Sequence, residues 1–147
     1  MLDITKADDA VSLFQQGFNC TQSILSVFAP EFRLDRDMTR RISQGFGAGI
    51  ARTDKMCGSL SAAITVIGLR YGDIRADDVA AKEKTCAVVG EFLNKFKEHH
   101  GSVACTDLLG YDLSDPRQFA DAKTHKVVME RCPVFIRDAV RLVETLI

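Results

Sequence analysis

Several features that mark common classes of protein are missing from this sequence of 147 residues. There is no excess of one charge, because 19 lysines and arginines face 20 aspartates and glutamates. Nucleic acids and anionic membranes select basic surfaces, so neither is expected as a partner. The longest apolar stretch, residues 60–69, is interrupted by Ser61 and Thr65. It is far shorter than the roughly 18 residues of a membrane span.

The first residues of the sequence are not expected to form a secretory signal. The first nine residues include Asp3, Asp8 and Asp9 and contain no apolar run. A cytoplasmic, reducing location is therefore expected, where permanent disulfides are rare and cysteines are catalytic, redox-sensing, metal-binding or inert. The length predicts a single domain, residues 1–147, that can bury a core without disulfides.

Alternating strand patterns are absent, and apolar residues instead recur at helical spacing. The pattern predicts an all-α, single-domain bundle of about six to seven helices joined by short connections. Residues 56–71 are apolar nearly all round and are predicted to form the central buried helix. The predicted helices start near Thr5, Cys20, Asp37, Met56, Asp77, Ser114 and Pro133.

Four of the five cysteines, Cys20, Cys57, Cys105 and Cys132, fall where a helix or helical turn is predicted to begin. A helix N-terminus carries partial positive charge, which favours the thiolate and lowers a thiol pKa. These four are the candidate catalytic residues. The capping signals are, in chain order, Asn19, Thr53 or Asp54, Ser102, and Pro133 as a first helical residue.

Cys57 is the strongest candidate for a nucleophile. Arg52 and Lys55 lie within five residues of it, and nearby positive charge is expected to hold its pKa below the free value of about 8.5. Cys86, in contrast, shares a predicted helix face with Val89. It is expected to be buried, structural and the slowest thiol to react.

The sequence has no C-x-x-C motif, which excludes a thioredoxin-type dithiol within one turn. A disulfide must join different helices, and four cysteines allow three pairings, with Cys20 the preferred partner of Cys57. Structural zinc sites usually start from closely spaced ligand pairs, which are also absent. Zinc or an iron–sulfur cluster held by all four cysteines remains an alternative.

Two further patterns have ordinary structural explanations. Gly45, Gly47 and Gly49 lack the strand–turn–helix order of a dinucleotide-binding motif. They predict a flexible loop whose backbone passes close to the cysteine site. His99 and His100 fit the C-terminus of a helix better than a metal site.

Four stretches carry the four cysteines in a fixed order, the first three together with glycine: residues 17–20, 45–72, 101–110 and 131–133. In this order and spacing the chain resembles the redox-active proteins named for their C_GCAxxG_C_C cysteine pattern. The resemblance implies a small helical protein with four functional cysteines. Gly58, beside Cys57, is a supporting residue of the site. The chain departs from the pattern where Ser59 replaces an alanine and Ala62 a glycine, both small exchanges that preserve close packing.

These observations support three hypotheses of different classes. The first is a thiol redox protein, a thiol-dependent oxidoreductase in enzymatic terms, whose Cys57 attacks a disulfide or oxidised substrate before a second cysteine resolves the intermediate. Its partner would be a protein or small-molecule disulfide. The second is a metal-binding module that holds zinc or an iron–sulfur cluster. The third is a non-catalytic helical interaction domain.

Overall fold

Five helices of the computed structural model, which describes residues 3–147, begin at a side chain that accepts a backbone hydrogen bond. This arrangement satisfies N–H groups that have no partner within the helix. Thr5 and Asn19 are caps predicted from the sequence, whereas two predicted caps are displaced by one or two residues. The caps are Thr5 for α1 (Lys6–Gln15), Asn19 for α2 (Cys20–Phe28), Asp35 for α3 (Arg36–Ser43), Asp78 for α6 (Val79–His100) and Asp115 for α8 (Pro116–Thr124).

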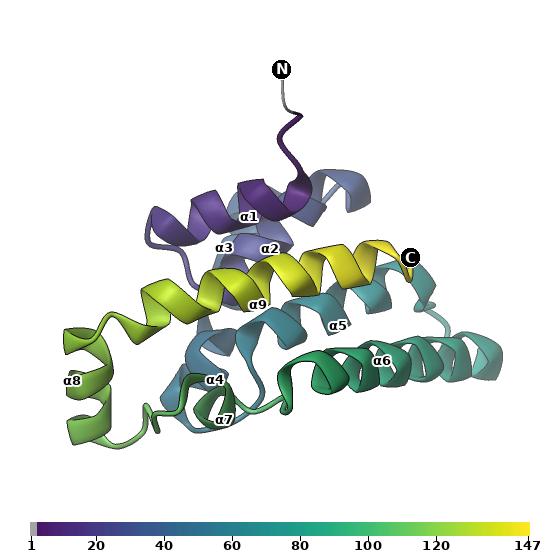
Figure 1. Ribbon diagram of the computed structural model, residues 1–147. Helices are drawn as coiled ribbons and strands as arrows, with labels where there is room; N and C mark the ends of the chain where they lie inside the picture. The colour runs from purple at the N-terminus through teal and green to yellow at the C-terminus, as the bar shows by residue number, and fades with distance from the viewer. Residues whose placement is uncertain (1–2) are drawn as a thin grey trace.

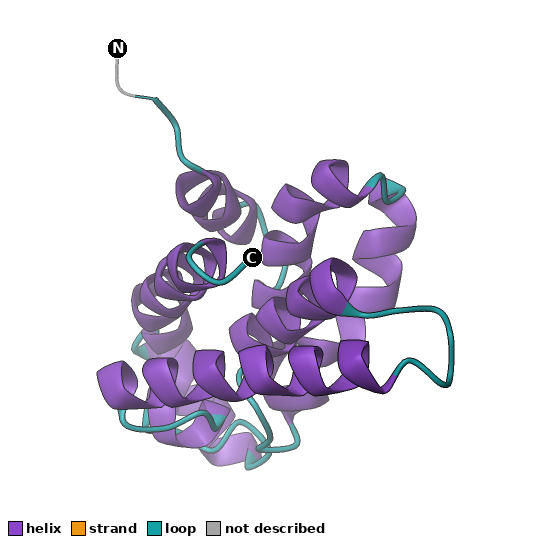
Figure 2. Ribbon diagram, turned by 90° about the vertical axis from the view of Figure 1, so that its right-hand side faces the viewer, coloured by secondary structure: helices purple, strands orange, loops and turns teal. Residues whose placement is uncertain are grey.

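The predicted all-α fold is confirmed. Over residues 3–147 the chain forms eight right-handed α-helices and no strand. Figures 1 and 2 show these helices joined by loops and turns. The predicted helix after Ser114 divides into α8 and the first turns of α9, and the predicted turn at Cys105 is α7. The remaining elements are η1 (Ala29–Phe32), η2 (Gln44–Phe46), the left-handed α4 (Gly47–Arg52), α5 (Gly58–Tyr71), α7 (Cys105–Leu109) and α9 (Val127–Glu144).

Helix α5 is the central helix, as its apolar sequence predicts. It packs against α2, α6 and α9 (Figure 1), and Leu60, Val66 and Ile67 are fully buried. Burial of each such side chain contributes about 1.5–3 kcal/mol to folding. Helices α5, α7 and α9 start toward the same end of the bundle (Figure 1). The N-terminal residues of these three helices therefore lie near one another.

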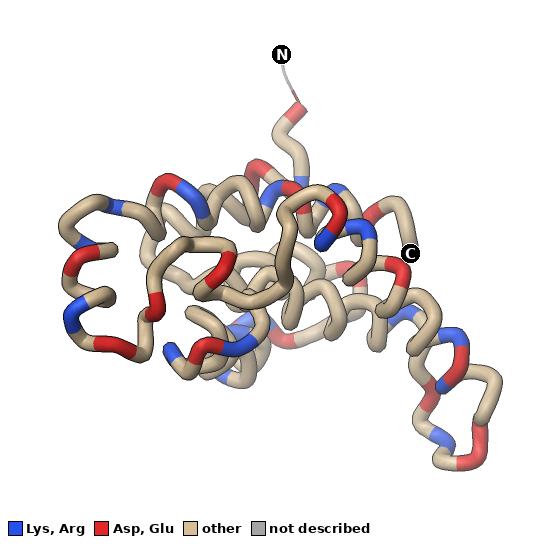
Figure 3. The backbone as a smooth tube through the Cα atoms, turned by 60° about the horizontal axis from the view of Figure 1, so that its bottom comes forward, with Lys and Arg blue, Asp and Glu red and all other residues tan. Residues whose placement is uncertain are grey.

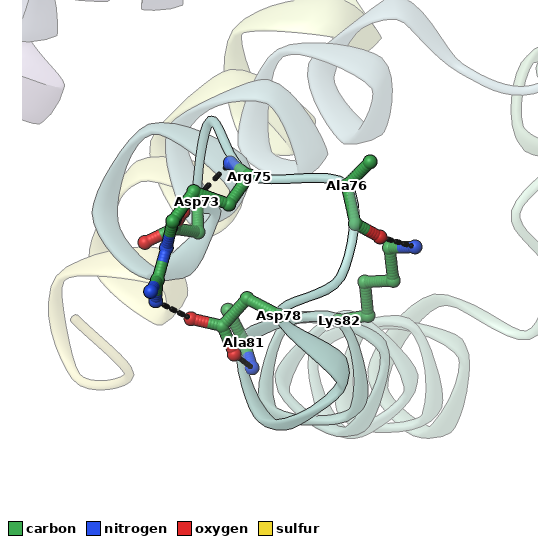
Figure 4. A network of polar contacts seen from close by, with 6 residues as sticks. All are labelled: Asp73, Arg75, Ala76, Asp78, Ala81 and Lys82. Carbon is green, nitrogen blue, oxygen red and sulfur yellow. Dashed lines mark hydrogen bonds and ion pairs between the residues drawn. The ribbon is translucent and has the colours of Figure 1, made fainter.

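The connection between α5 and α6 is held by ion pairs and backbone contacts (Figure 4). Arg75 Nη2 lies 2.7 Å from Asp78 Oδ2, and Lys82 Nζ donates to the carbonyl of Ala76 at 2.6 Å. Acidic and basic residues are interspersed along the chain (Figure 3), in agreement with the net charge of −1. Among the described residues, no helix is both long enough and apolar enough to cross a membrane.

Candidate functional site

The four predicted site cysteines line a single small cavity at this end of the bundle. The cavity has a volume of about 90 Å³, and most of its other walls are apolar side chains. Cys20, Cys57 and Cys105 are only 6–8% exposed, and Cys132 is half-buried. The tertiary fold therefore brings together four sulfur atoms that lie far apart in the sequence.

Three of the four cysteines occupy the predicted helix starts. Cys20 is the first residue of α2, Cys105 is the first residue of α7, and Cys57 directly precedes α5. The predicted caps of two of these helices are wrong. Cys57 itself holds the N-cap position of α5 and Ala104 that of α7, and neither makes a side-chain capping bond.

The predicted position of Cys132 at a helix start is wrong, because α9 begins at Val127 and continues through Pro133. Proline removes one intrahelical hydrogen bond and usually interrupts a helix. Val128 and Phe135, two turns apart on the same face, both line the cysteine cavity. Packing of this face carries the helix through the proline and places Cys132 in its interior.

A pair of backbone hydrogen bonds ties the segment of Cys57 to that of Cys105. The Cys57 N–H donates to the carbonyl of Val103, and the Cys105 N–H donates to the carbonyl of Lys55, both at 2.9 Å. The paired segments form an isolated antiparallel bridge at Met56. Lys55, singled out in the sequence for its charge, contributes to the site through its backbone carbonyl, which binds the Cys105 N–H.

Gly58 brings the start of α2 against the start of α5. A side chain at Gly58 would overlap the Cys20 sulfur and the Thr21 hydroxyl. The Thr21 hydroxyl donates a buried hydrogen bond of 2.9 Å to the Gly58 carbonyl. The absence of a Cβ atom therefore lets Cys20 Sγ approach the residue that follows Cys57.

The glycine-containing segment passes close to the site, as predicted, but it is not a flexible loop, because it forms η2 and the left-handed turn α4. Residues 48–52 have φ values between 52° and 68°, the left-handed region, which costs about 1–2 kcal/mol per non-glycine residue. A Cβ atom on Gly49 would lie 2.7 Å from Cys105 Cβ. The Gly49 carbonyl accepts a hydrogen bond of 3.0 Å from the Lys55 N–H. These contacts hold the strained turn against α7.

The expectation of a low pKa at Cys57 is wrong. Burial, with a smaller contribution from the neighbouring Cys20, raises the pKa of Cys57 from 9.0 to about 12. A shift of this size corresponds to about 4 kcal/mol, whereas a helix N-terminus contributes at most about 2 kcal/mol. Neither Arg52 nor Lys55 is among the main influences on this pKa. Loss of hydration therefore outweighs the helix terminus.

Cys20 has the largest set of hydrogen-bond donors for a thiolate. Burial raises its pKa, but the backbone N–H groups of Ala48, Thr21 and Cys20 itself, together with the Thr21 hydroxyl, oppose that increase. The Ala48 donor comes from the left-handed segment, which packs near α2 only in the folded chain. The Ala48 donor could not be predicted from the sequence, because Ala48 lies 28 residues from Cys20. The Thr21 donor could, because Thr21 directly follows Cys20.

Cys105 and Cys132 are also held in the neutral form. Burial raises the pKa of Cys105 to about 12, with smaller contributions from Cys20 and Asp54. Burial also raises the pKa of Cys132, and thiolates at the other three cysteines would raise it further. The cavity therefore favours uncharged sulfur at all four positions.

Ser59 places a buried hydroxyl beside Cys57. Ser59 is fully buried, and its hydroxyl oxygen has no hydrogen-bond partner among the described residues. Its backbone N–H and its hydroxyl both lower the pKa of Cys57, because they donate to the thiolate once it forms. The serine that departs from the family pattern thus adds a donor aimed at a catalytic candidate.

The prediction that Cys86 is buried is wrong, because Cys86 is exposed. The buried face of α6 contains Val88, Phe92 and Phe96. Cys86 precedes Val88 by two residues, about 200° around the helix, and therefore faces solvent. The prediction relied on Val89, which is only partly buried and lies next to Val88 on the buried face.

Alkylation of the folded, reduced protein is expected to modify Cys86 first. Cys86 is exposed, whereas Cys20, Cys57 and Cys105 are nearly closed from solvent. We expect a rate difference of about tenfold or more, because alkylation requires an accessible thiolate. Peptide mass spectrometry of a time course measures the order. A rapid phase that persists in Cys86→Ser would contradict this assignment.

The stability of the reduced protein is expected to fall as the pH rises above about 9. Unfolded Cys57 and Cys105 lose a proton near that pH, but the folded forms retain it to about 12. The folded state then binds more protons, so the free energy of unfolding decreases by about 1.4 kcal/mol per pH unit for each thiol. Urea unfolding at about pH 7.5 and about pH 10 measures the change. An equal decrease in a variant with every cysteine changed to alanine would contradict this origin.

A metal ion requires several ligand side chains that converge on one point. Within residues 3–147, no three histidine, cysteine, aspartate or glutamate side chains are placed to hold one ion together. His99 and His100 lie at the C-terminus of α6, as predicted, and do not line the cysteine cavity. The positions of the four sulfur atoms therefore do not fit a single zinc ion as they stand.

Together, the fold and the site define a small helical protein that gathers four cysteines from separate helices around one small, largely buried cavity. The chain belongs to the family described as "Putative redox-active protein (C_GCAxxG_C_C)", whose sequence profile matches residues 18–146. The resemblance found from the cysteine pattern is thereby confirmed. No curated protein and no solved structure gave a significant match to the chain.

Proposed function

We propose that this is a thiol redox protein in which Cys20 and Cys57 interconvert between a dithiol and a disulfide. The observation that carries the proposal is the cavity lined by cysteines from different helices. Cys20 Sγ lies against Gly58, the residue that follows Cys57. The Cys20 charge is also the largest neighbouring charge that acts on the Cys57 pKa.

The largely buried cavity suits the two end states of this reaction. Burial disfavours thiolates, as the raised pKa values of Cys20 and Cys57 indicate. A dithiol and a disulfide are both uncharged, so neither incurs the cost of burying a charge. Only the short-lived thiolate does, and the donors around Cys20 and the Ser59 hydroxyl reduce that cost.

The proposed reaction is thiol–disulfide exchange with a disulfide RSSR. One protein thiolate attacks a sulfur of RSSR, a mixed disulfide forms, and the first RS⁻ leaves and takes up a proton. The second protein thiolate then attacks the mixed disulfide, which releases the second RS⁻. The protein loses two electrons and two protons, and RSSR becomes two RSH. A dithiol reductant reverses the reaction.

Cys105 and Cys132 provide a second pair of thiols in the same cavity. We propose that they accept the disulfide from Cys20 and Cys57 by exchange, since one S–S bond forms as another breaks. This assigns a redox role to each of the four cysteines in the family pattern.

Metal or cluster binding is the second candidate function. The convergence of Cys20, Cys57, Cys105 and Cys132 on one cavity favours it, because iron–sulfur clusters commonly take four cysteine ligands. The same sulfur atoms are not arranged for one ion. Anaerobic purification followed by metal analysis and an absorption spectrum tests this candidate. Stoichiometric iron or zinc would favour it over the dithiol.

Disulfide mapping tests the leading proposal. Metal-free protein carrying Cys86→Ser is reduced, treated with bis(2-hydroxyethyl) disulfide, denatured under acid and analysed by peptide mass spectrometry. We expect intramolecular disulfides among the cavity cysteines and complete recovery of thiols on reduction. Four thiols that still titrate after this treatment would reject the proposal.

A further inference from the structure

An open cleft of about 630 Å³ lies beside the cysteine cavity. The two spaces share Asn19, Ala48 and Leu113 as wall residues. The cleft volume lies within the range of about 300–1,000 Å³ that small-molecule sites occupy. The cysteine cavity, at about 90 Å³, can admit little more than the reacting sulfur. A substrate would therefore rest in the cleft and extend its sulfur past the shared wall.

The cleft has an uncompensated positive charge. Arg52 is the only charged residue in its lining, and its guanidinium is held 4.7 Å above the Phe119 ring. Lys123 Nζ lies 5.7 Å from the same ring. Arg52 forms no ion pair within residues 3–147. The nearby Asp115 carboxylate already accepts hydrogen bonds from two backbone N–H groups of α8.

The shared wall also connects the cleft with a particular sulfur. Ala48 lines both spaces, and its backbone N–H lowers the pKa of Cys20 because it stabilises the thiolate. Asn19, which also lines both spaces, directly precedes Cys20 in the chain. A molecule bound in the cleft therefore contacts the residues that surround Cys20.

We propose that the cleft binds one half of a small disulfide that carries carboxylates and presents its sulfur to Cys20. The proposal rests on the thiol redox function above and names its substrate class. Arg52 binds a carboxylate, for which a guanidinium provides paired donors. Cys20 then attacks the bound disulfide, and Cys57 resolves the mixed disulfide in the balanced exchange already described.

Binding is tested with S-methylglutathione, an unreactive peptide that carries carboxylates. Chemical shifts of the full-length protein are followed during titration. We expect saturable binding that Arg52→Gln weakens about five- to tenfold and Arg52→Lys weakens less. The matched control is Arg33→Gln, since Arg33 is also exposed and also has a positive φ, of 54°, but does not line the cleft. Equal binding by wild type and Arg52→Gln would overturn the cleft assignment.

Kinetics separate the cleft assignment from the redox function. Reduced protein carrying Cys86→Ser is oxidised with glutathione disulfide, which is anionic, bis(2-hydroxyethyl) disulfide, which is neutral, and cystamine, which is cationic. We expect Arg52→Gln to lower the ratio of the anionic to the neutral rate constant about fivefold and to raise the relative rate with cystamine.

Different failures have different meanings. Failure of the neutral disulfide to oxidise the wild-type cavity would reject the redox function. If the neutral disulfide oxidises the cavity normally, but Arg52→Gln does not change the preference for the anionic disulfide, only the cleft assignment is overturned. Equal slowing of all three disulfides by Arg52→Gln would also overturn it, because Arg52 would then act on the thiol and not on the substrate.

Discussion

Serine in place of Cys57 is expected to abolish reversible two-electron oxidation of the Cys20–Cys57 pair, because the disulfide requires both sulfur atoms. Cys20→Ser should have the same effect. In a background with Cys86, Cys105 and Cys132 all changed to serine, an added disulfide should leave Cys57→Ser trapped as a mixed disulfide on Cys20. Intact-mass spectrometry measures the retained RS group. The buried hydroxyl should also lower the free energy of unfolding by about 1–3 kcal/mol.

The exposed cysteine provides the control for this experiment. Cys86→Ser alone is expected to leave both oxidation of the cavity and stability nearly unchanged, since Cys86 faces solvent. A Cys57→Ser protein that retains Cys105 and Cys132 and forms an intramolecular disulfide through Cys20 as fast as the parent protein would contradict the pairing. It would assign the partner of Cys20 to Cys105 or Cys132.

Alanine in place of Gly58 is expected to disrupt the site through a single added methyl group. Its Cβ atom would overlap the Cys20 sulfur and the Thr21 hydroxyl at the buried contact between α2 and α5. Overpacking of this kind costs about 1–3 kcal/mol. The same displacement should prevent Cys20 from pairing with Cys57. Urea unfolding measures the stability, and disulfide mapping measures the pairing.

Gly68→Ala is the matched control in the same helix. A Cβ atom on Gly68 would meet nothing within 4 Å, so alanine is expected to stabilise the helix by about 0.5–1 kcal/mol. The two substitutions should therefore change the free energy of unfolding in opposite directions. Equal effects would show that no steric constraint acts at Gly58, and would contradict the proposed approach of Cys20.

The sequence by itself predicted the features that depend on near neighbours. A capping side chain acts within three residues, so Thr5 and Asn19 identified the starts of α1 and α2 correctly. The apolar composition of residues 56–71 identified the central helix, α5. The spacing of glycine and cysteine identified the family and the four cysteines that line the cavity.

The tertiary structure decided the features that depend on distant contacts. The exposure of Cys86 depends on which face of α6 meets the core, and neighbouring apolar residues left that face ambiguous by one position. Cys132 lies inside α9 because packing carried the helix through Pro133. Arg52 stacks on Phe119, 67 residues away in the chain, where the sequence suggested only its proximity to Cys57.

The thiol pKa values show the same division most clearly. The sequence placed Cys57 at a helix start, where the local field favours a thiolate. The assembled bundle removed water from that sulfur, and its pKa rose to about 12. Capping and helix fields are set by residues a few positions away and can be predicted from sequence. Hydration is set by every element that surrounds the atom, so only the tertiary structure determines it.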